Sequence, residues 1–406
     1  MPAGAPASAV AAVLLAAGVS VAGAAQVTFV VTAPAGTPET ATLHVCGDRA
    51  EIGSWSGSGF ALRFAGGGRW TGTLELPEGA AFEFKLTRGG WDTVEKDAQG
   101  GELGNRSAVA RDGDTLSVAV AAWRDRTERA TPRAHTLLGD FRRHDAFPSK
   151  HVSARDVVVW LPPGYEASEG RRYPVIYFHD GQNVFDGATS FIPGQEWRAD
   201  ETADSLIRNR RVPPFLMVAV ANTAKRMSEY TRVADERNGG GGQEAYDRFL
   251  LDELKPFIDA TYRTKPGAAS TGIVGSSLGG LASLSLGLSY PDRFGLVGCV
   301  SPSVWWGKGE VVRYVQSGKG HPVRLWLDMG TAEGRAAMPE SDENILGARA
   351  LRDACLERGW SEGRDFRYFE AAGAGHNERA WAQRLPQILE FLLQAMEPSA
   401  PPAPAR

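Results

Sequence analysis

The chain has 406 residues, of which 43% are hydrophobic and 23% charged, and its formal net charge at pH 7 is -4. This composition is typical of a soluble globular protein, and the length predicts two domains. The charge and the lack of a Lys/Arg-rich stripe argue against a nucleic-acid partner, because phosphate-binding surfaces are basic. Cys46, Cys299 and Cys355 are too widely spaced for a zinc site or a disulfide framework, so we expect buried thiols, no metal and no cofactor.

The N-terminus carries an apolar run of small residues over 8–25, which ends just before Gln26. This layout resembles the apolar segment and cleavage site of a signal peptide, although no Lys or Arg precedes it. An alanine-rich disordered leader, or a start codon placed too far downstream, would give the same run. We expect residues 1–25 to be a signal peptide and the protein to be secreted or periplasmic. No later segment is apolar enough to span a membrane, so we expect no membrane partner.

Residues 26–122 contain short stretches with alternating apolar residues, separated by Gly- and Pro-rich turns: VTFVVTA, ATLHVCG, WTGTLELP, AFEFKLTR and TLSVAVA. This pattern predicts a small all-β sandwich. The charged stretch 123–135 has no apolar period and is the predicted linker.

Residues 136–396 alternate between apolar strands and helical stretches, which predicts an α/β domain. The expected strands are DVVVWLP, PVIYFHDG, FLMVAVAN, TGIVGSS, LVGCVSPS, VRLWLDMG and FRYFEA, and their continuous apolar runs suit a parallel sheet buried on both faces. Residues 244–262 have the apolar period of one amphipathic helix. The Pro/Ala-rich tail 397–406 is expected to be disordered.

The sequence Gly275-Ser276-Ser277-Leu278-Gly279 follows a short apolar strand and precedes a helical stretch. A nucleophile elbow needs this strand, turn and helix, and its glycines avoid clashes around the strained central serine. Ser277 is the central residue, whereas Ser276 lacks the two flanking glycines. Although a Gly/Ser helix entry would look similar, the context predicts Ser277 as the nucleophile of an α/β-hydrolase fold.

A serine nucleophile needs a base, and the chain order of this fold is serine, acid, histidine. Only His321 and His376 follow Ser277. His321 lies in a turn before a strand, whereas His376 lies in a glycine-rich loop between the strand FRYFEA and the last helix. The sequence therefore predicts His376 as the base.

The acid should follow the strand VRLWLDMG, whose carboxyl end lies on the same rim as the elbow. Glu333 lies in the loop beyond this strand and is the preferred acid. Asp328, within the strand, and Asp342 remain alternatives.

The oxyanion needs two backbone N–H groups, one of them from the residue after the nucleophile, Leu278. The other is expected from Gln182, in the turn after PVIYFHDG. His179 in the same turn is interpreted as a structural histidine.

Taken together, PVIYFHDGQNVFD, ANTAKRMSEYT, GSSLGGLASL, YPDRFG, SPSVWW and GHNERAW resemble the putative esterase family of α/β-hydrolases. The resemblance covers about residues 130–396. That family includes feruloyl and acetyl xylan esterases, enterochelin esterases and mycolyltransferases. The resemblance implies a Ser, acid, His triad, here Ser277, Glu333 and His376, without fixing the ester.

The first domain is similar to the starch-binding carbohydrate-binding module through HVCGDRAEIGSWSG, WTGTLELPEGAAFEFKLTRGGWDTVEKD and Asn105-Arg106. In that family two tryptophans stack on sugar rings, and Trp55 and Trp91 occupy the matching neighbourhoods. The apolar faces of sugars pack on aromatic planes in this way. Both tryptophans would equally suit a structural role.

Three further tryptophans are candidates for binding the substrate. Trp305 and Trp306 follow the strand LVGCVSPS and could line a pocket, with core packing equally open for at least one of them. Trp197 lies in a loop expected at the same rim.

The sequence thus predicts a serine carboxylic ester hydrolase that works through an acyl-enzyme, on feruloyl or acetyl esters of polysaccharide. A siderophore trilactone of the enterochelin type is the alternative substrate. An acyltransferase would differ only in the use of an alcohol instead of water at the acyl-enzyme. A non-catalytic carbohydrate-binding protein would have a broken triad.

Overall fold

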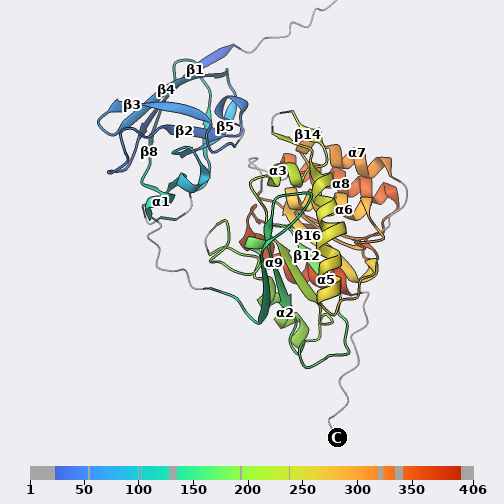
Figure 1. The fold of residues 1–406 in the computed structure, drawn as a ribbon. Helices are drawn as coiled ribbons and strands as arrows, with labels where there is room; N and C mark the ends of the chain where they lie inside the picture. Colours follow the sequence, from blue (N-terminus) through green and yellow to red (C-terminus); the bar gives the residue numbers. More distant parts are fainter. Residues whose placement is uncertain are drawn as a thin grey trace, which may run out of the picture. The chain divides into compact units, whose positions relative to one another are not determined.

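The computed structural model describes residues 23–53, 55–98, 100–101, 103–127, 135–192, 194–236, 238–318, 323–333 and 342–394. Two compact units divide between Ala130 and Thr131, and each is described by itself (Figure 1). Most of the predicted signal peptide, part of the predicted linker, His321 and the predicted tail lie outside the described residues.

The first unit is built on a seven-stranded sheet in the order β7-β5-β2-β3-β4-β1-β8. Every neighbouring pair is antiparallel except β1 and β8. The strands are β1 (Ala24–Thr32), β2 (Leu43–Gly47), β3 (Phe60–Gly66), β4 (Arg69–Pro77), β5 (Ala81–Thr87), β7 (Arg106–Val109) and β8 (Thr115–Ala119). A separate pair and three short helices complete the unit: β6 (Glu95–Lys96), β9 (Ala122–Trp123), η1 (Ala50–Ile52), η2 (Trp91–Thr93) and α1 (Arg124–Thr127).

This sheet folds over its own core. Strands β1 and β5 are not neighbours in the sheet, yet the ring of Phe29 on β1 lies 6.3 Å from that of Phe82 and 5.4 Å from that of Phe84 on β5. The predicted all-β fold is confirmed. The prediction omitted β3 and β7; only one of the seven residues of β3 is buried and none of the four in β7, so neither strand alternates between buried and exposed residues along its length.

The limits of this unit differ from the predicted limits at both ends. Ala25 is fully buried in β1, so the sandwich begins before Gln26. Trp123 is fully buried in β9, and its indole N–H donates to the hydroxyl of Thr37 at 2.9 Å. The first residues of the predicted linker therefore belong to the sandwich.

The second unit contains an eight-stranded sheet in the order β10-β11-β13-β12-β16-β17-β18-β19. Strand β11 is antiparallel to both neighbours, and the pairs from β13 to β19 are parallel. The strands are β10 (Asp140–Phe147), β11 (Arg155–Leu161), β12 (Val175–Phe178), β13 (Leu216–Val220), β16 (Thr271–Ser277), β17 (Leu296–Pro302), β18 (Arg324–Gly330) and β19 (Phe366–Ala371). The seven predicted strands and the α/β fold are confirmed. The omitted strand β10 lies at the sheet edge, where its exposed charged residues give no apolar run.

Helices cover both faces of this sheet (Figure 1). One apolar core contains residues of α5 (Lys255–Thr261), α6 (Leu278–Ser289), α7 (Glu310–Ser317) and α8 (Glu343–Arg358). The opposite core contains residues of α2 (Ala199–Arg208) and α9 (Glu378–Leu393). Burial on both faces explains why the central strands are apolar throughout. The remaining short elements are η3 (Gly181–Asn183), α3 (Arg226–Glu229), β14 (Ala234–Asp235), β15 (Gly239–Gly240), η5 (Ala268–Ser270) and η6 (Trp306–Lys308).

The predicted helix over 244–262 is not a single α-helix. It consists of α4 (Gln243–Arg248), a π-helical segment η4 (Phe249–Leu254) and α5. Pro256 in the first turn of α5 has no N–H to donate to the preceding turn, so the regular hydrogen-bond ladder is interrupted there.

Candidate active site

Ser277 ends strand β16 and directly precedes α6. Its backbone has φ 59° and ψ -124°, a conformation that L-residues rarely adopt and that stores strain. The strained turn between strand and helix lifts the side chain out of the sheet, as a nucleophile elbow requires.

The glycines around Ser277 are required by close packing. A Cβ at Gly275 would lie 2.6 Å from the carbonyl oxygen of Gly279, and a Cβ at Gly279 would lie 3.2 Å from Cβ of His179. His179 is buried behind the elbow, and its Nδ1 lies 3.0 Å from the hydroxyl of Tyr246. Burial lowers the pKa of His179 to about 4, so its ring is neutral at pH 7. His179 therefore supports the turn from behind.

His376 and Glu333 lie in the loops after β19 and β18, on the same rim of the sheet. Nδ1 of His376 is 2.8 Å from Oε2 of Glu333. Because an ionised carboxylate only accepts hydrogen bonds, Nδ1 carries the hydrogen and Nε2 of the neutral ring is free to accept a proton. The side chain of His376 is 39% exposed, whereas that of Glu333 is 1% exposed. The imidazole thus faces solvent above a buried carboxylate.

The two alternative acids have other roles in the structure. The carboxylate of Asp328 is buried within β18, where it accepts the backbone N–H of Ser301 at 3.1 Å and the indole N–H of Trp326 at 2.7 Å. Asp342 caps α8 by accepting the backbone N–H of Asn344 at 2.8 Å. Of the three candidates, only Glu333 contacts His376 among the hydrogen bonds of the described residues.

Ser301 holds the second oxygen of Glu333. Its hydroxyl donates to Oε1 at 2.5 Å, beside the backbone N–H of Gly330 at 2.7 Å. The same hydroxyl accepts the indole N–H of Trp381 at 3.1 Å and a guanidinium N–H of Arg384 at 2.9 Å. One donated and two accepted bonds use the full capacity of a hydroxyl group.

The surroundings of Glu333 favour its ionised form. Burial alone would raise the pKa of this carboxyl, but the hydrogen bond from His376, the Ser301 hydroxyl and the Arg384 guanidinium outweigh it and hold the pKa below its usual value. Trp381 also packs edge-on against the His376 ring at 5.0 Å. The imidazole is therefore fixed by a hydrogen bond at one edge and by an aromatic ring.

The hydroxyl of Ser277 is paired with a second serine. Its Oγ lies 3.1 Å from Oγ of Ser303, and the backbone N–H of Ser303 donates to the carbonyl of Ser277 at 3.2 Å. No hydrogen bond joins Ser277 to His376 in the described part of the chain. Hydrogen bonds between a catalytic nucleophile and its base are often long in an enzyme without substrate, and they shorten in the complex with substrate.

The two residues expected to bind the oxyanion begin helical turns. Leu278 is the first residue of α6, and Gln182 lies in the single turn η3. The first N–H groups of a helix have no acceptor within it, so they are available to a negatively charged oxygen. The carbonyl of Gln182 accepts from the hydroxyl of Thr189 at 2.7 Å, and its side-chain oxygen accepts the backbone N–H of Asn222 at 3.2 Å. These bonds fix the η3 turn.

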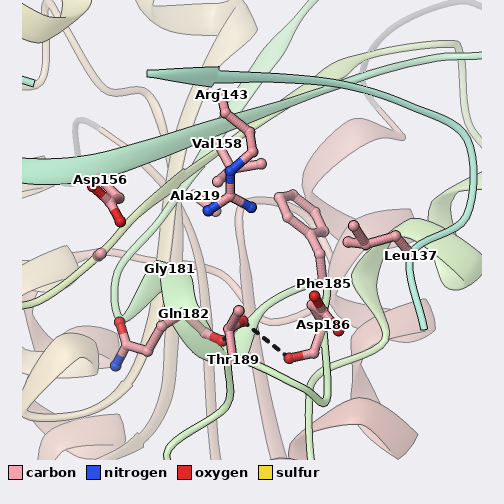
Figure 2. A pocket seen from close by; sticks show the side chains of 11 residues that line it. Leu137, Arg143, Asp156, Val158, Gly181, Gln182, Phe185, Asp186, Thr189 and Ala219 are labelled. Carbon is pink, nitrogen blue, oxygen red and sulfur yellow. Dashed lines mark hydrogen bonds between the residues drawn. The ribbon is translucent and has the colours of Figure 1, made fainter. Parts of the chain in front are cut away.

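A small pocket of about 70 Å³ lies beside the η3 turn. Figure 2 shows the guanidinium of Arg143 between Ala219 and Phe185, with the side chain of Gln182 across the pocket. Asp186 and Thr189 line it as well. The pocket provides polar groups next to the proposed oxyanion residue.

The three tryptophans expected to bind substrate have different exposures. Trp305 is 50% exposed, whereas Trp306 is 3% exposed and donates its indole N–H to the carbonyl of Val233 at 2.8 Å. Trp197 is also 3% exposed and packs 5.8 Å from the ring of Trp381. Trp306 and Trp197 are thus core residues in this structure, and only Trp305 offers a ring to a substrate.

In the first unit, Trp55 and Trp91 lie together. Their ring centroids are 6.2 Å apart with an interplanar angle of 36°, and the indole N–H of Trp91 donates to the carbonyl of Trp55 at 3.1 Å. Both side chains are partly exposed. The two rings form an accessible aromatic surface suited to the apolar face of a sugar.

Sequence reasoning missed Ser301, Ser303 and Arg384, which surround the acid and the nucleophile. The motif SPSVWW contains both serines, but the sequence does not reveal which side of the strand each hydroxyl faces. Arg384 lies in α9, where its spacing resembles that of any helical arginine.

No cluster of His, Cys, Asp and Glu suited to a metal ion occurs in the ranges that the structure describes. Within those ranges, no helix is both long and apolar enough to cross a bilayer.

Family models match both parts of the chain. Residues 152–392 match the family described as "Putative esterase", and residues 24–112 match the family described as "Starch binding domain".

Three curated proteins illustrate the range of relatives. YbbA of Bacillus subtilis, an uncharacterized protein, is 25% identical over 60% of this chain and 95% of its own length. The ferri-bacillibactin esterase BesA of the same organism is 28% identical over 47% of this chain and 67% of its own length. An endo-1,4-beta-xylanase/feruloyl esterase of Xylanibacter ruminicola is 32% identical over 35% of this chain, but the match covers only 19% of that protein.

Among solved structures, the enterobactin esterase FES of Shigella flexneri, with 2,3-di-hydroxy-N-benzoyl-serine present, has a TM-score of 0.50 and 16% identity. The match covers 88% of this chain and 90% of that chain. The BES protein of Bacillus cereus also has a TM-score of 0.50, with 20% identity over 65% of this chain and 98% of that chain. These likenesses concern the fold.

Proposed function

Because this chain belongs to the putative esterase family and is a carboxylic ester hydrolase, we propose that it works through an acyl-enzyme formed on Ser277. The observation that carries this proposal is the strained Ser277 elbow on the same rim as the hydrogen-bonded pair of Glu333 and His376.

In the first half of the reaction, Ser277 Oγ attacks the ester carbonyl carbon while Nε2 of His376 takes the hydroxyl proton. Glu333 keeps the ring oriented and stabilises the imidazolium that forms. The carbonyl oxygen gains negative charge and accepts the N–H groups of Leu278 and Gln182. His376 then returns the proton to the departing alcohol.

In the second half, water attacks the acyl carbon with the same residues in the same roles. His376 takes a proton from water, and the carboxylic acid leaves as the Ser277 hydroxyl is restored. The preference for water over an alcohol makes the protein a hydrolase rather than an acyltransferase.

We propose feruloyl or acetyl esters of polysaccharide as the substrates. The starch binding domain match and the aromatic pair Trp55 and Trp91 support a glycan partner. A relative named as a xylanase/feruloyl esterase supports the same class. The exposed ring of Trp305 suits an aromatic acyl group.

A siderophore trilactone is the second candidate substrate. It is favoured by the match to a ferri-bacillibactin esterase, which covers 67% of that protein.

We further propose export to the periplasm or the medium, because the apolar run over 8–25 resembles a signal peptide and polysaccharide esters occur outside cells.

The mechanism is tested with p-nitrophenyl acetate and butyrate and the variant Ser277→Ala. We expect the variant to lose activity by at least about a thousandfold, as removal of a serine nucleophile does in other hydrolases. Ser276→Ala, a change of a buried neighbour in the same strand, is the matched control and should stay active. Full activity of folded Ser277→Ala would contradict the nucleophile assignment.

The substrate is tested with methyl ferulate, acetylated xylan and a catecholate trilactone, compared by kcat/KM. We expect a higher value for the feruloyl or acetyl ester. A clear preference for the trilactone would instead select the siderophore function.

A further inference from the structure

The end of strand β17 contains a bulge opposite Ser277. Ser276 is paired with Val300, but Ser277 is paired with Pro302, so Ser301 is an extra residue without a partner. Ser301 has φ 41°, in the left-handed region that non-glycine residues rarely occupy. Bulges of this kind change the direction of neighbouring side chains and are common beside active sites.

Because of the bulge, the side chains of Ser301 and Ser303 have different hydrogen-bond partners. The Ser301 hydroxyl contacts Glu333, Trp381 and Arg384, on the side of the acid. The hydroxyl of Ser303, two residues later, contacts Oγ of Ser277. A regular strand would place both serines on one face, because side chains two residues apart point the same way.

We propose that Ser303 is a further catalytic residue, which donates its hydroxyl hydrogen to Oγ of Ser277 as that oxygen attacks the ester. The inference rests on the proposed acyl-enzyme mechanism and deepens it.

The direction of this hydrogen bond follows from the chemistry. Ser277 has one hydroxyl hydrogen, and this hydrogen must point toward His376 for proton transfer. In that state, Oγ of Ser277 can only accept from Ser303, so Ser303 must be the donor. In the described residues, Ser303 Oγ has no other hydrogen-bond partner that would compete for its hydrogen.

The position of Ser303 strengthens the hydrogen bond that it donates to Oγ of Ser277. Ser303 is buried, with 5% of its surface exposed, and a main-chain bond to Ser277 fixes the distance between the two residues. Hydrogen bonds to charged atoms in a water-poor environment are stronger than bonds between neutral groups. The contact is therefore stronger when Oγ carries negative charge during attack than in the resting enzyme, as catalysis requires.

The proton balance of the step leaves Ser303 unchanged. The bond from Ser277 Oγ to the acyl carbon forms, the Oγ–H bond breaks, and that proton passes to Nε2 of His376. As the carbonyl re-forms, the bond between the acyl carbon and the alcohol oxygen breaks, and the leaving alcohol takes the proton from His376. Ser303 keeps its own hydrogen throughout and stabilises the oxygen only by donation.

The test measures the rate at which a fluorophosphonate probe labels Ser277 in the full chain, together with kcat and KM for p-nitrophenyl butyrate. In labelling, Oγ forms a bond to phosphorus and fluoride leaves. We expect Ser303→Ala to lower the labelling rate and kcat by about tenfold to a hundredfold, the usual effect of losing a hydrogen bond to a charged atom, with little change in KM.

Two further variants separate catalysis from packing. Ser303→Thr keeps the hydroxyl and should restore most of the rate. Ser303→Cys keeps the size but has a weak donor, so its rate should fall as in Ser303→Ala. Ser285→Ala in α6 is the matched control, since Ser285 is also 5% exposed and its hydroxyl has no hydrogen-bond partner among the described residues. It should label at the wild-type rate.

The outcomes distinguish this inference from the mechanism on which it rests. If the wild-type protein is not labelled at Ser277, the acyl-enzyme mechanism itself fails. If the wild type is labelled and Ser303→Ala or Ser303→Cys reacts equally fast, only the role of Ser303 is overturned. Failure of Ser303→Thr to restore the rate above that of Ser303→Ala would also overturn it.

Discussion

Oε2 of Glu333 lies 2.8 Å from Nδ1 of His376, although the two residues are 43 positions apart in the sequence. The contact forms because parallel strands β18 and β19 end at the same rim, and both residues lie in the loops that follow. Asp328, five residues earlier, remains inside the strand and bonds to Arg384 and Trp326 instead.

The first prediction concerns the acid. We expect Glu333→Gln to lower kcat by about 10⁴-fold, because the amide would favour the wrong tautomer of His376. The measurement is kcat for p-nitrophenyl butyrate with folding checked by circular dichroism. Asp342→Asn is the control, since asparagine still caps α8 and activity should be kept. A Glu333→Gln variant as active as the control would contradict the role of Glu333.

We expect Asp328→Asn to lower the free energy of unfolding, whereas Glu333→Gln lowers kcat. Arg384 is buried, and Nη1 lies 3.0 Å from Oδ1 of Asp328. Removing one partner of a buried ion pair costs about 3–5 kcal/mol in the free energy of unfolding. Urea unfolding measures this loss, and unchanged stability of the variant would disprove it.

The two neighbouring tryptophans should respond differently to substitution. Trp305 is exposed, so Trp305→Ala should leave the melting temperature nearly unchanged but raise KM for methyl ferulate by up to about tenfold, as expected for a lost aromatic contact. Trp306 is buried, and Trp306→Ala should cost about 3–5 kcal/mol of stability. If Trp305→Ala leaves KM for methyl ferulate unchanged, Trp305 does not contact the acyl group.

The aromatic pair of the first unit is tested with starch. We expect Trp55→Ala and Trp91→Ala in the full chain each to weaken binding to insoluble starch by about tenfold, because a stacking surface is lost. Hydrolysis of p-nitrophenyl butyrate should be unchanged. Val109→Ala changes another exposed apolar residue of the same unit and should bind starch normally. Normal binding by both tryptophan variants would show that the pair is structural.

The last prediction concerns pH and Asp247 in α4. Burial raises the pKa of this carboxyl from 3.8 to about 7, partly opposed by a hydrogen bond from Gln243. Because the folded-state pKa is raised, the folded protein binds more protons than the unfolded chain between about pH 4 and pH 7. Asp247 therefore makes the free energy of unfolding fall as pH rises through this window.

Asp247→Asn should remove this dependence and stabilise the protein at pH 8 by on the order of 1–3 kcal/mol, with little effect at pH 4. Urea unfolding at both pH values is the measurement. Asp252→Asn, a change of an exposed carboxylate in the same helical segment, should alter neither value. Equal stability of Asp247→Asn and wild type at pH 8 would contradict the raised pKa.

Features encoded by neighbouring residues could be predicted from the sequence. The buried strands were recognisable because burial on both faces demands continuous apolar runs, and the glycines around Ser277 marked the elbow because only they avoid its close contacts. The loop of His376 followed from chain order in this fold. The broken helix over 244–262 was missed because its apolar period continues through Pro256.

Other features were decided by the tertiary structure. The path of the loop after β18 decides which carboxylate reaches His376. The sequence preferred Glu333 but left Asp328 and Asp342 as alternative acids. The exposure of Trp305 and the burial of Trp306 depend on what packs against each ring. The bulge at Ser301 is set by pairing with β16, so the sequence alone could not show that one serine of SPSVWW faces Glu333 and the other faces Ser277.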